Sequence, residues 1–565
     1  MSNLSFDTLF STVPTPGWLA LGACITVALY RLSHPKRTLG GLPGPPTPSW
    51  TFGHFKTLFG FDAIPYFEYL ASNYGSTVKV YGALGSELIW TFDPAAMHSM
   101  LVKDRANFER FEDTTTFIRL TLGGGLLALK GEEHRVHRKI LNPVFTMRFL
   151  RERKWNATYV EMPIFMNVAK RTCEAIDNEV GSIEAAPKDI DIFPWMTAGA
   201  LELVGEAGLG YSFDSLTGKR NEYSTAIRDL LRFFRKIVPF AIILPYISNI
   251  GTPSFRRWVV QRLPIPGLAG LLHATSIQNK QAEEVLQARR TLLASGHDLT
   301  SEAGRGRDIL TLLMKANEAE GAENHIDHEA VVGHMNTFIF AGHETTSTAM
   351  SRIIQILAEN DHIQNTLREE ICRYFAVHSD DTHHDELLEL PYLDAVVRET
   401  LRLYGPVSGL FRQSQVDTVL PLEFPVDTPK GKITSIPIKK GQRILINIIM
   451  ANRCERIWGE RASEFWPERW IGHKLEEVTQ PGAHLPGVYS SMMAFGGGPT
   501  SCIGFKFAVM EIKVMISILV KTFKFEPSEQ KIRWETLGIQ APHLQSEMKN
   551  PSKLPKLPVR VTKID

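Results

Sequence analysis

A single cysteine near the end of the chain lies in the segment that most clearly suggests chemistry. The residues read Phe495-Gly-Gly-Gly-Pro-Thr-Ser-Cys502-Ile-Gly504, and an apolar run after them predicts a helix from Phe505 to about Phe523. A cysteine just before a helix lies near the positive end of the helix dipole, which favours its thiolate. Thiolates bind soft or borderline metals, and glycines let the backbone approach a flat group closely. Cys502 is therefore a candidate metal ligand.

An acid and two hydroxyl groups interrupt an otherwise apolar predicted helix. This helix covers residues 327–359, with the aspartate at its start as N-cap, and contains Ala-Gly-His-Glu-Thr-Thr at 341–346. The apolar run at 338–340 indicates that this turn is buried, although an exposed polar face is the alternative. Burying an acid or a hydroxyl without a partner is costly. Glu344 and Thr345 are therefore candidate functional residues.

The cysteine segment resembles the cysteine loop of the cytochrome P450 family, whose pattern is F-x-x-G-x-x-x-C-x-G. The resemblance implies haem b as the cofactor, with Cys502 as its axial thiolate and metal ligand. It also implies that Phe495 packs beside the thiolate and that Gly498 and Gly504 leave room for the porphyrin. Thr500 stands where the family usually has an arginine that pairs with a haem propionate.

The same resemblance places the helix over 327–359 on the distal side of the haem. Thr345 would help deliver protons during oxygen activation, and Glu344 would be its acidic neighbour in the relay. The implied fold is mainly α with a smaller β-rich lobe, an α+β arrangement. The haem would lie between this distal helix and the proximal helix that begins at Phe505.

A charged pair further along the chain matches a structural motif of the family. Glu399-Thr-Leu-Arg402 is its E-x-x-R pattern, and side chains three residues apart share one helix face. Arg469, within Phe-Trp-Pro-Glu-Arg-Trp, matches the third member of this cluster. The resemblance assigns Glu399, Arg402 and Arg469 to folding and haem retention. Seen alone, the pair would be a surface salt bridge.

Basic residues match the positions at which the family binds the haem propionates. The segment that starts Gly131-Glu-Glu-His and ends at Arg138 resembles the W-x-x-x-R helix, with His134 in place of the tryptophan. Arg138 and Arg412 would bind propionates because guanidinium groups suit carboxylates, and an imidazole can also donate a hydrogen bond to one. With Thr500 uncharged, these two arginines should carry more of the anchoring.

The composition excludes several classes of protein. The chain has 565 residues, 44% of them hydrophobic, and a net charge of +1, so it fits a large globular enzyme and lacks the basic surplus of a nucleic-acid binder. Its five scattered cysteines contain no C-x-x-C, which predicts neither a disulfide framework nor a zinc site. We find no Gly-x-Gly-x-x-Gly after a strand and no P-loop, so we expect no nicotinamide, flavin or ATP site.

The elements that must position these residues follow from local patterns. Alternating residues at 76–81 and 87–92 predict a hairpin, and mainly helical periodicity follows from 94 to about 367. Short strands punctuated by glycine and proline are expected over 430–449.

The N-terminus predicts attachment to a membrane. Residues 8–30 form an uncharged stretch that is long enough to span a bilayer as a helix. Arg31, Lys36 and Arg37 follow this stretch. The positive-inside rule then places the rest in the cytosol. We expect a membrane anchor with its basic flank at 1–36, a proline-rich spacer at 37–55 and the monooxygenase domain at 56–565. A cleaved signal peptide is the alternative, but no basic residue precedes the apolar run.

These features resemble the microsomal, fungal type of the family. The resemblance implies a single-pass protein of the endoplasmic reticulum membrane that takes electrons from an NADPH-cytochrome P450 reductase, with cytochrome b5 as a further partner. Apolar and aromatic residues in the expected pocket predict a lipophilic substrate that is hydroxylated with O2. A terpenoid of secondary metabolism is our first hypothesis; fatty acids, alkanes and polycyclic aromatics are alternatives. A haem-thiolate isomerase or peroxygenase, or a non-catalytic haem- or lipid-binding relative, remain open.

Overall fold

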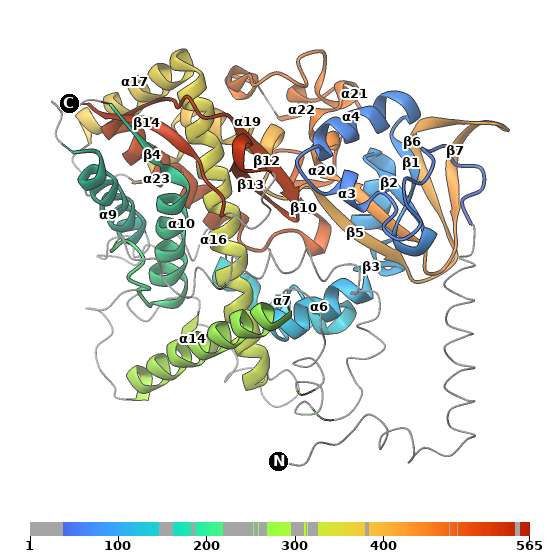
Figure 1. The fold of residues 1–565 in the computed structure, drawn as a ribbon, viewed down its shortest axis with the longest axis horizontal. Helices are drawn as coiled ribbons and strands as arrows, with labels where there is room; N and C mark the ends of the chain where they lie inside the picture. The colour runs from blue at the N-terminus through green and yellow to red at the C-terminus, as the bar shows by residue number, and fades with distance from the viewer. Residues whose placement is uncertain are drawn as a thin grey trace.

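Helices form most of the molecule; many of the strands lie in a smaller lobe on the right of the view in Figure 1, and the others lie between the helices at the centre and left. The computed structural model describes residues 38–145, 162–181, 187–217, 268–294, 326–378, 384–473, 475–482, 484–548 and 554–564, with single residues at 226, 252, 258, 310, 311, 313 and 314. The expected fold class, mainly α with a β-rich lobe, is confirmed.

The central element is α16 (His328–Glu359), which crosses the helical part of the molecule (Figure 1). Its N-terminus is capped by Asp327, whose carboxylate accepts from the backbone N–H of Ala330 at 2.7 Å. This agrees with the helix predicted over 327–359. Three helices that matter for the site pack against it: α10 (Ile192–Leu203), α19 (Pro391–Tyr404) and α23 (Phe505–Thr522).

The other helices surround this centre. The longer ones are α4 (Ala63–Tyr74), α6 (Glu112–Leu122), α7 (Gly131–Leu141), α9 (Met162–Val180), α14 (Leu268–Ala294) and α17 (Asp361–Val377). Short helices are α3 (Phe55–Leu58), α5 (Pro94–His98), α18 (His384–Leu388), α20 (Ile448–Arg453), α21 (Glu455–Trp458) and α22 (Leu475–Val478). Single tight or wide turns are η1 (Ala83–Gly85), η2 (Ser99–Lys103), η3 (Arg105–Asn107), η4 (Asn142–Phe145), η5 (Val204–Leu209), η7 (Pro467–Trp470), η8 (Gly498–Thr500) and η9 (Gln545–Glu547).

A five-stranded sheet organises the β-rich lobe in the order β1-β2-β8-β5-β3. The predicted hairpin is present as β1 and β2, which pair antiparallel, while β2 and β8 run parallel. At the edge, β3 pairs with β5, so Glu109 lies opposite Gln413. The sheet thereby joins segments that are more than 300 residues apart in sequence, since Glu109 and Gln413 are separated by 304 positions. Its strands are β1 (Thr77–Tyr81), β2 (Glu87–Thr91), β3 (Phe108–Glu109), β5 (Gly409–Ser414) and β8 (Arg443–Asn447).

Smaller sheets complete the described fold. The strands expected over 430–449 are β7 (Gly431–Ile438) and β8, whereas β6 (Thr418–Thr428), the partner of β7, was not predicted. A three-stranded sheet has the order β11-β14-β4, and two further pairs are β10-β9 and β12-β13. Their bounds are β4 (Lys188–Asp191), β9 (Gly487–Tyr489), β10 (Met492–Gly497), β11 (Phe523–Pro527), β12 (Ile532–Leu537), β13 (Ile539–Leu544) and β14 (Pro558–Lys563).

The segment expected as a proline-rich spacer packs closely on the β-rich lobe from residue 38 onward. Leu39 and Leu42 are buried, and a Cβ atom on Gly44 would lie 1.9 Å from the carbonyl oxygen of Lys79. The expected anchor at 1–36 lies outside the described residues. Within the described ranges, no helix has both the length and the apolar character to cross a bilayer.

Candidate active site

The cysteine loop connects β10 to α23 through the single turn η8. The backbone N–H of Cys502 donates to the carbonyl oxygen of Phe495 at 2.8 Å, which closes the loop. Gly498 has φ +64°, and a Cβ atom there would lie 2.0 Å from the carbonyl oxygen of Leu101. Glycine is therefore required at this position by the neighbouring turn η2 as well as by the backbone angle.

Cys502 presents its side chain to an accessible space although protein surrounds it. The residue is exposed, yet burial is the largest influence on its thiol and raises its pKa. The backbone N–H of Gly504 and the charge of Arg138 act in the opposite direction. The thiol is therefore reachable by a ligand while protein atoms surround it closely. The two positive neighbours favour the thiolate that a metal would bind.

Aromatic side chains support the loop. The Phe495 ring lies 5.5 Å from that of Tyr489 and 5.9 Å from that of Phe505, centroid to centroid. Gly504 precedes α23 as its N-cap residue, and a Cβ atom there would make only an ordinary contact of 3.7 Å with Phe145. Packing within the protein thus does not by itself require glycine at 504.

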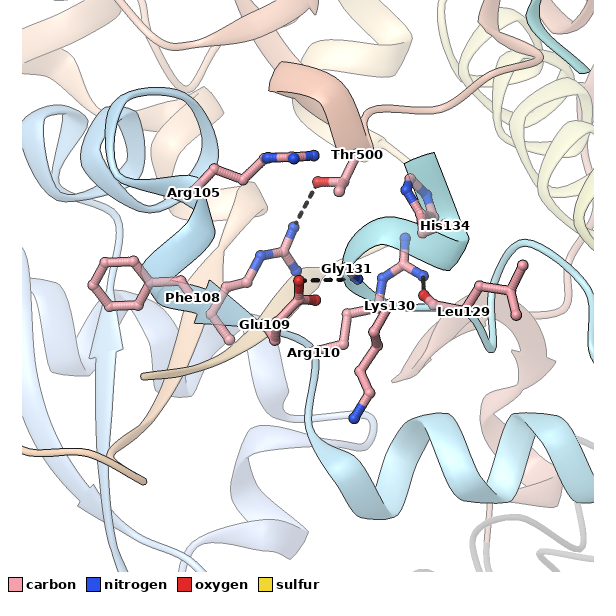
Figure 2. Close-up of a pocket in the computed structure, with 10 residues that line it drawn as sticks. Arg105, Phe108, Glu109, Arg110, Leu129, Lys130, Gly131, His134 and Thr500 are labelled. Carbon is pink, nitrogen blue, oxygen red and sulfur yellow. Dashed lines mark hydrogen bonds between the residues drawn. The ribbon is translucent and has the colours of Figure 1, made fainter. Parts of the chain in front are cut away.

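A pocket rich in basic groups lies beside this loop (Figure 2). Arg412 donates from one nitrogen to the Thr500 hydroxyl at 3.0 Å and from the other to the carbonyl oxygen of Phe411 at 2.8 Å. Thr500 therefore orients Arg412 in place of supplying a charge itself. The pairing of β3 with β5 brings Arg110, which follows β3, next to Arg412. Arg105 lines the same pocket.

Positively charged side chains surround a buried imidazole in this pocket. Burial, followed by the charges of Arg110, Arg138, Arg105 and Arg412, lowers the pKa of His134 to about 3. Burial and the charge of Arg110 also lower the pKa of Arg412, to about 10. Within the described ranges, no carboxylate forms an ion pair with any of these four arginines, and Nε2 of His134 is buried without a hydrogen-bond partner.

This arrangement fits a ligand with carboxylates. Arg412 is buried, whereas Arg105, Arg110 and Arg138 are half-buried, and four guanidinium groups in this arrangement favour an anion between them. The propionates of a porphyrin would supply that negative charge, and Cys502 would be the ligand of its iron. Sequence patterns pointed to His134, Arg138 and Arg412. The structure places His134 and Arg412 in the pocket with Arg105 and Arg110, whereas Arg138 lies near His134 and donates to the carbonyl oxygen of Ser501 at 2.6 Å. Arg105 and Arg110 carried no recognisable signal in the sequence, because only the fold brings them to the pocket.

On α16, hydroxyl and carboxyl groups cluster within one turn. The Thr345 hydroxyl donates to the carbonyl oxygen of Ala341 at 2.6 Å, and the Thr346 hydroxyl donates to that of Gly342. Such back-bonding loosens a helix locally. Glu344 is buried, and its Oε1 lies 3.1 Å from Nε2 of His343. Thr345 is only half-buried, so its hydroxyl is the more accessible of these groups.

The structure brings Glu399, Arg402 and Arg469 together in the core. Both carboxylate oxygens of Glu399 accept from Arg402, at 2.7 and 2.8 Å, and Arg469 lies 3.5 Å away. Glu399 also accepts from the backbone N–H of Trp466 and the indole N–H of Trp470. Arg402 donates further to three backbone carbonyls at 452, 462 and 464. The cluster therefore fastens α19 to the loop that precedes the cysteine segment.

Apolar side chains from segments that we expect to line a substrate pocket pack together in two groups. A separate hydrophobic cluster joins α6 to α14 through Phe117, Leu122 and Leu271, and Ile118 and Phe340 pack against it. In the second group, the rings of Phe111 and Phe411 lie 5.1 Å apart. A further segment expected at the pocket, residues 233–245, lies outside the described residues. The lining of a substrate pocket by these segments stays a prediction.

Comparison with known proteins agrees with this site. A family model described as Cytochrome P450 matches residues 43–542. The chain is 38% identical to cytochrome P450 monooxygenase 91 of Postia placenta, over 93% of this chain and 94% of the relative. It is 35% identical to a ganoderic acid synthetase of Ganoderma lucidum, over 92% of this chain and 94% of the relative. With the cysteine loop, the basic pocket and the polar turn of α16 in place, the chain belongs to the cytochrome P450 family of haem-dependent monooxygenases.

Proposed function

We propose that this enzyme hydroxylates C–H bonds of a lipophilic small molecule, with Cys502 as the axial ligand of its haem and electrons from an NADPH-dependent reductase. The observation that carries the proposal is the accessible Cys502 thiol at the start of α23, beside four arginines without carboxylate partners. When bound, haem supplies the activation of O2 and the transfer of one oxygen atom to the substrate.

The residues of the chain divide the remaining work. Arg138 and Arg412, with Arg105 and Arg110, hold the propionates, and neutral His134 donates a hydrogen bond to one of them. Phe495, Gly498 and Gly504 shape the loop around the thiolate. Glu399, Arg402 and Arg469 keep that loop in place and so retain the cofactor.

We assign the delivery of protons to Thr345 and Glu344. The Thr345 hydroxyl already donates to a backbone carbonyl, so its lone pairs can accept a proton and pass one on. Glu344, one residue earlier, is buried and lies next to a second ionisable group. Positioned proton transfer of this kind contributes about 10²–10⁴-fold to a rate.

The substrate class follows from the wall and from one relative. The described segments that we expect to line the pocket carry aromatic and aliphatic side chains, which suit an apolar substrate with few polar groups. One relative is named as a ganoderic acid synthetase, an enzyme of terpenoid metabolism. We therefore propose a terpenoid substrate of secondary metabolism.

We also propose that residues 1–36 anchor the protein in the endoplasmic reticulum membrane, with the domain over 56–565 in the cytosol beside the reductase and cytochrome b5. The uncharged run at 8–30 and the basic residues after it support this topology. Residues 38–55 pack on the β-rich lobe, so the domain would lie close to the membrane surface.

The decisive experiment is the absorption spectrum of the reduced, carbon-monoxide-bound protein. Wild type should give the strongly red-shifted Soret band of thiolate-ligated haem. Cys502→Ala should abolish this band, whereas Cys372→Ala, which removes another exposed cysteine, should keep it. If Cys502→Ala retained the band, another residue would be the ligand and the proposal would fail.

Turnover assays then distinguish reductase-dependent hydroxylation from peroxygenase activity. With reductase and NADPH, we expect hydroxylated product from a terpenoid panel in preference to fatty acids. Thr345→Ala should divert most of the NADPH consumed into hydrogen peroxide. Product formed equally well from hydrogen peroxide without reductase would favour the peroxygenase alternative instead.

A further inference from the structure

The two terminal nitrogens of Arg110 face different parts of the molecule. Its Nη1 donates to the backbone carbonyl oxygens of Leu126, Leu127 and Leu129, at 3.2, 3.0 and 3.3 Å. Its Nη2 makes no hydrogen bond to any residue that the structure describes. The guanidinium lines the basic pocket between Leu129 and His134 (Figure 2). One nitrogen therefore holds a segment of the chain, while the other is free to bind an anion in the pocket.

The segment that Arg110 holds, residues 123–129, lies with its backbone directly on α16, and we call it the strap. A Cβ atom on Gly125 would lie 2.2 Å from the carbonyl oxygen of Gly333. One on Gly333 would lie 2.6 Å from the backbone nitrogen of Gly124. No side chain fits between the two backbones, so the strap can lie against the helix only because glycine occupies both surfaces.

The strap connects the basic pocket to the apolar cluster between α6 and α14. At one end, Leu129 lines the basic pocket. Leu127 packs against the apolar cluster, as Phe340 of α16 does. The side chains of this cluster belong to segments that we expect to meet a substrate. A displacement of the strap would therefore change both the haem side and the substrate side of the site.

Repulsion between the arginines acts on Arg110 unless an anion lies among them. Burial lowers the pKa of Arg110, the charge of Glu109 opposes this effect, and the charge of Arg138 adds to it. Burial, followed by the charge of Arg110, lowers the pKa of Arg412. The neutral carbonyl oxygens of the strap do not cancel this repulsion, whereas a carboxylate between the guanidinium groups replaces it with attraction. A carboxylate in the pocket would thus fix Arg110 and, through it, the strap.

We propose that Arg110 couples haem binding to the substrate side of the site: a haem propionate binds its Nη2, and its Nη1 then holds the strap on α16. Arg110 is thus a positioning residue for Leu127 and the apolar cluster as well as a ligand of the propionate. This inference rests on the proposed haem site and substrate pocket. Because the coupling is an equilibrium property, it is reciprocal: a change that loosens the strap also weakens haem binding.

The test measures hydrogen exchange and haem transfer in the full-length, haem-loaded enzyme. Arg110→Gln should speed exchange of the strap amides about tenfold, the low end for losing a hydrogen bond to a charged group. It should also speed the transfer of haem to an excess of apomyoglobin. Arg110→Lys keeps the charge, but its single nitrogen cannot serve the anion and the three carbonyls together. This variant should retain haem better than Arg110→Gln and still lose protection of the strap.

Arg105 provides a matched control, because it lines the same pocket but donates to none of the strap carbonyls. Arg105→Gln should speed haem transfer and leave exchange of the strap amides at the wild-type rate. If the strap exchanged equally fast in Arg105→Gln and Arg110→Gln, general weakening of the pocket would explain the result. The inference would then be overturned.

Gly125→Ala tests the coupling from the opposite side. The added methyl group should lift the strap from α16 without touching the basic pocket. It should speed haem transfer when Arg110 is present and have no further effect in Arg110→Gln, because the link is already removed. Additive effects in the double variant would refute the coupling.

The outcomes separate this inference from the function on which it rests. Faster haem transfer in Arg110→Gln with an unchanged strap would refute the coupling and leave Arg110 as a propionate ligand. Unchanged haem transfer in Arg110→Gln would overturn the inference entirely. In either case, the spectrum of the reduced, carbon-monoxide-bound wild type still reports independently on the Cys502 ligand.

Discussion

Replacing Glu399 by glutamine tests how much the buried cluster contributes to stability. Glu399 and Arg402 are both inaccessible to solvent, and the carboxylate meets two guanidinium nitrogens at 2.7 and 2.8 Å. Glutamine keeps the shape but removes the negative charge, which leaves Arg402 with carbonyl partners alone. Breaking a buried ion pair in this way costs about 3–5 kcal/mol.

That loss is large compared with the whole stability of a protein, about 5–15 kcal/mol. At about 1.4 kcal/mol for each factor of ten, the unfolded fraction should rise by roughly two to four orders of magnitude. Equilibrium urea unfolding followed by tryptophan fluorescence measures the free energy of unfolding. The Soret absorbance in the same samples reports retention of haem.

The control uses a pair with the same spacing at the surface. Glu132 and Arg135 are also three residues apart on a helix, but their side chains are 68% and 60% exposed. Glu132→Gln should give an unfolding curve that superimposes on that of wild type. If Glu399→Gln also unfolded within about 1 kcal/mol of wild type, burial would not explain the role of this cluster.

Three further predictions concern other elements. Burial, with a smaller contribution from the charge of His137, lowers the pKa of His334 to about 3, below the roughly 6.5 of an unfolded chain, so the unfolded state binds the proton more readily. Its contribution to stability is therefore complete above about pH 6.5 and is lost as pH falls towards 3, and His334→Asn should flatten the urea midpoint over that range. Asp327→Ala should lower the free energy of unfolding by about 1 kcal/mol, measured by urea denaturation, because α16 loses its cap. Gly498→Ala should reduce haem incorporation, measured as the ratio of Soret to protein absorbance, because its Cβ atom would collide with the Leu101 carbonyl; full incorporation would contradict the constraint inferred there.

Local patterns in the sequence predicted much of the frame that holds the site. The cap, the apolar periodicity and the length of α16 depend only on neighbouring residues, and so do the hairpin of β1 and β2 and the helix after Cys502. Strand β6 was not predicted, because prolines at 421 and 425 interrupt its sequence and proline is unfavourable inside a strand.

The basic pocket illustrates what only the tertiary structure decided. Arg110 and Arg412 are far apart in sequence, and the pairing of β3 with β5 brings them to one pocket. Thr500 stands where an arginine was expected, and its hydroxyl accepts a hydrogen bond that orients Arg412. The sequence determined which chemical groups are available and which helices carry them, because those depend on local order. Tertiary packing decided which groups face one pocket, because such contacts depend on distances of a few ångströms between segments that only the fold brings together.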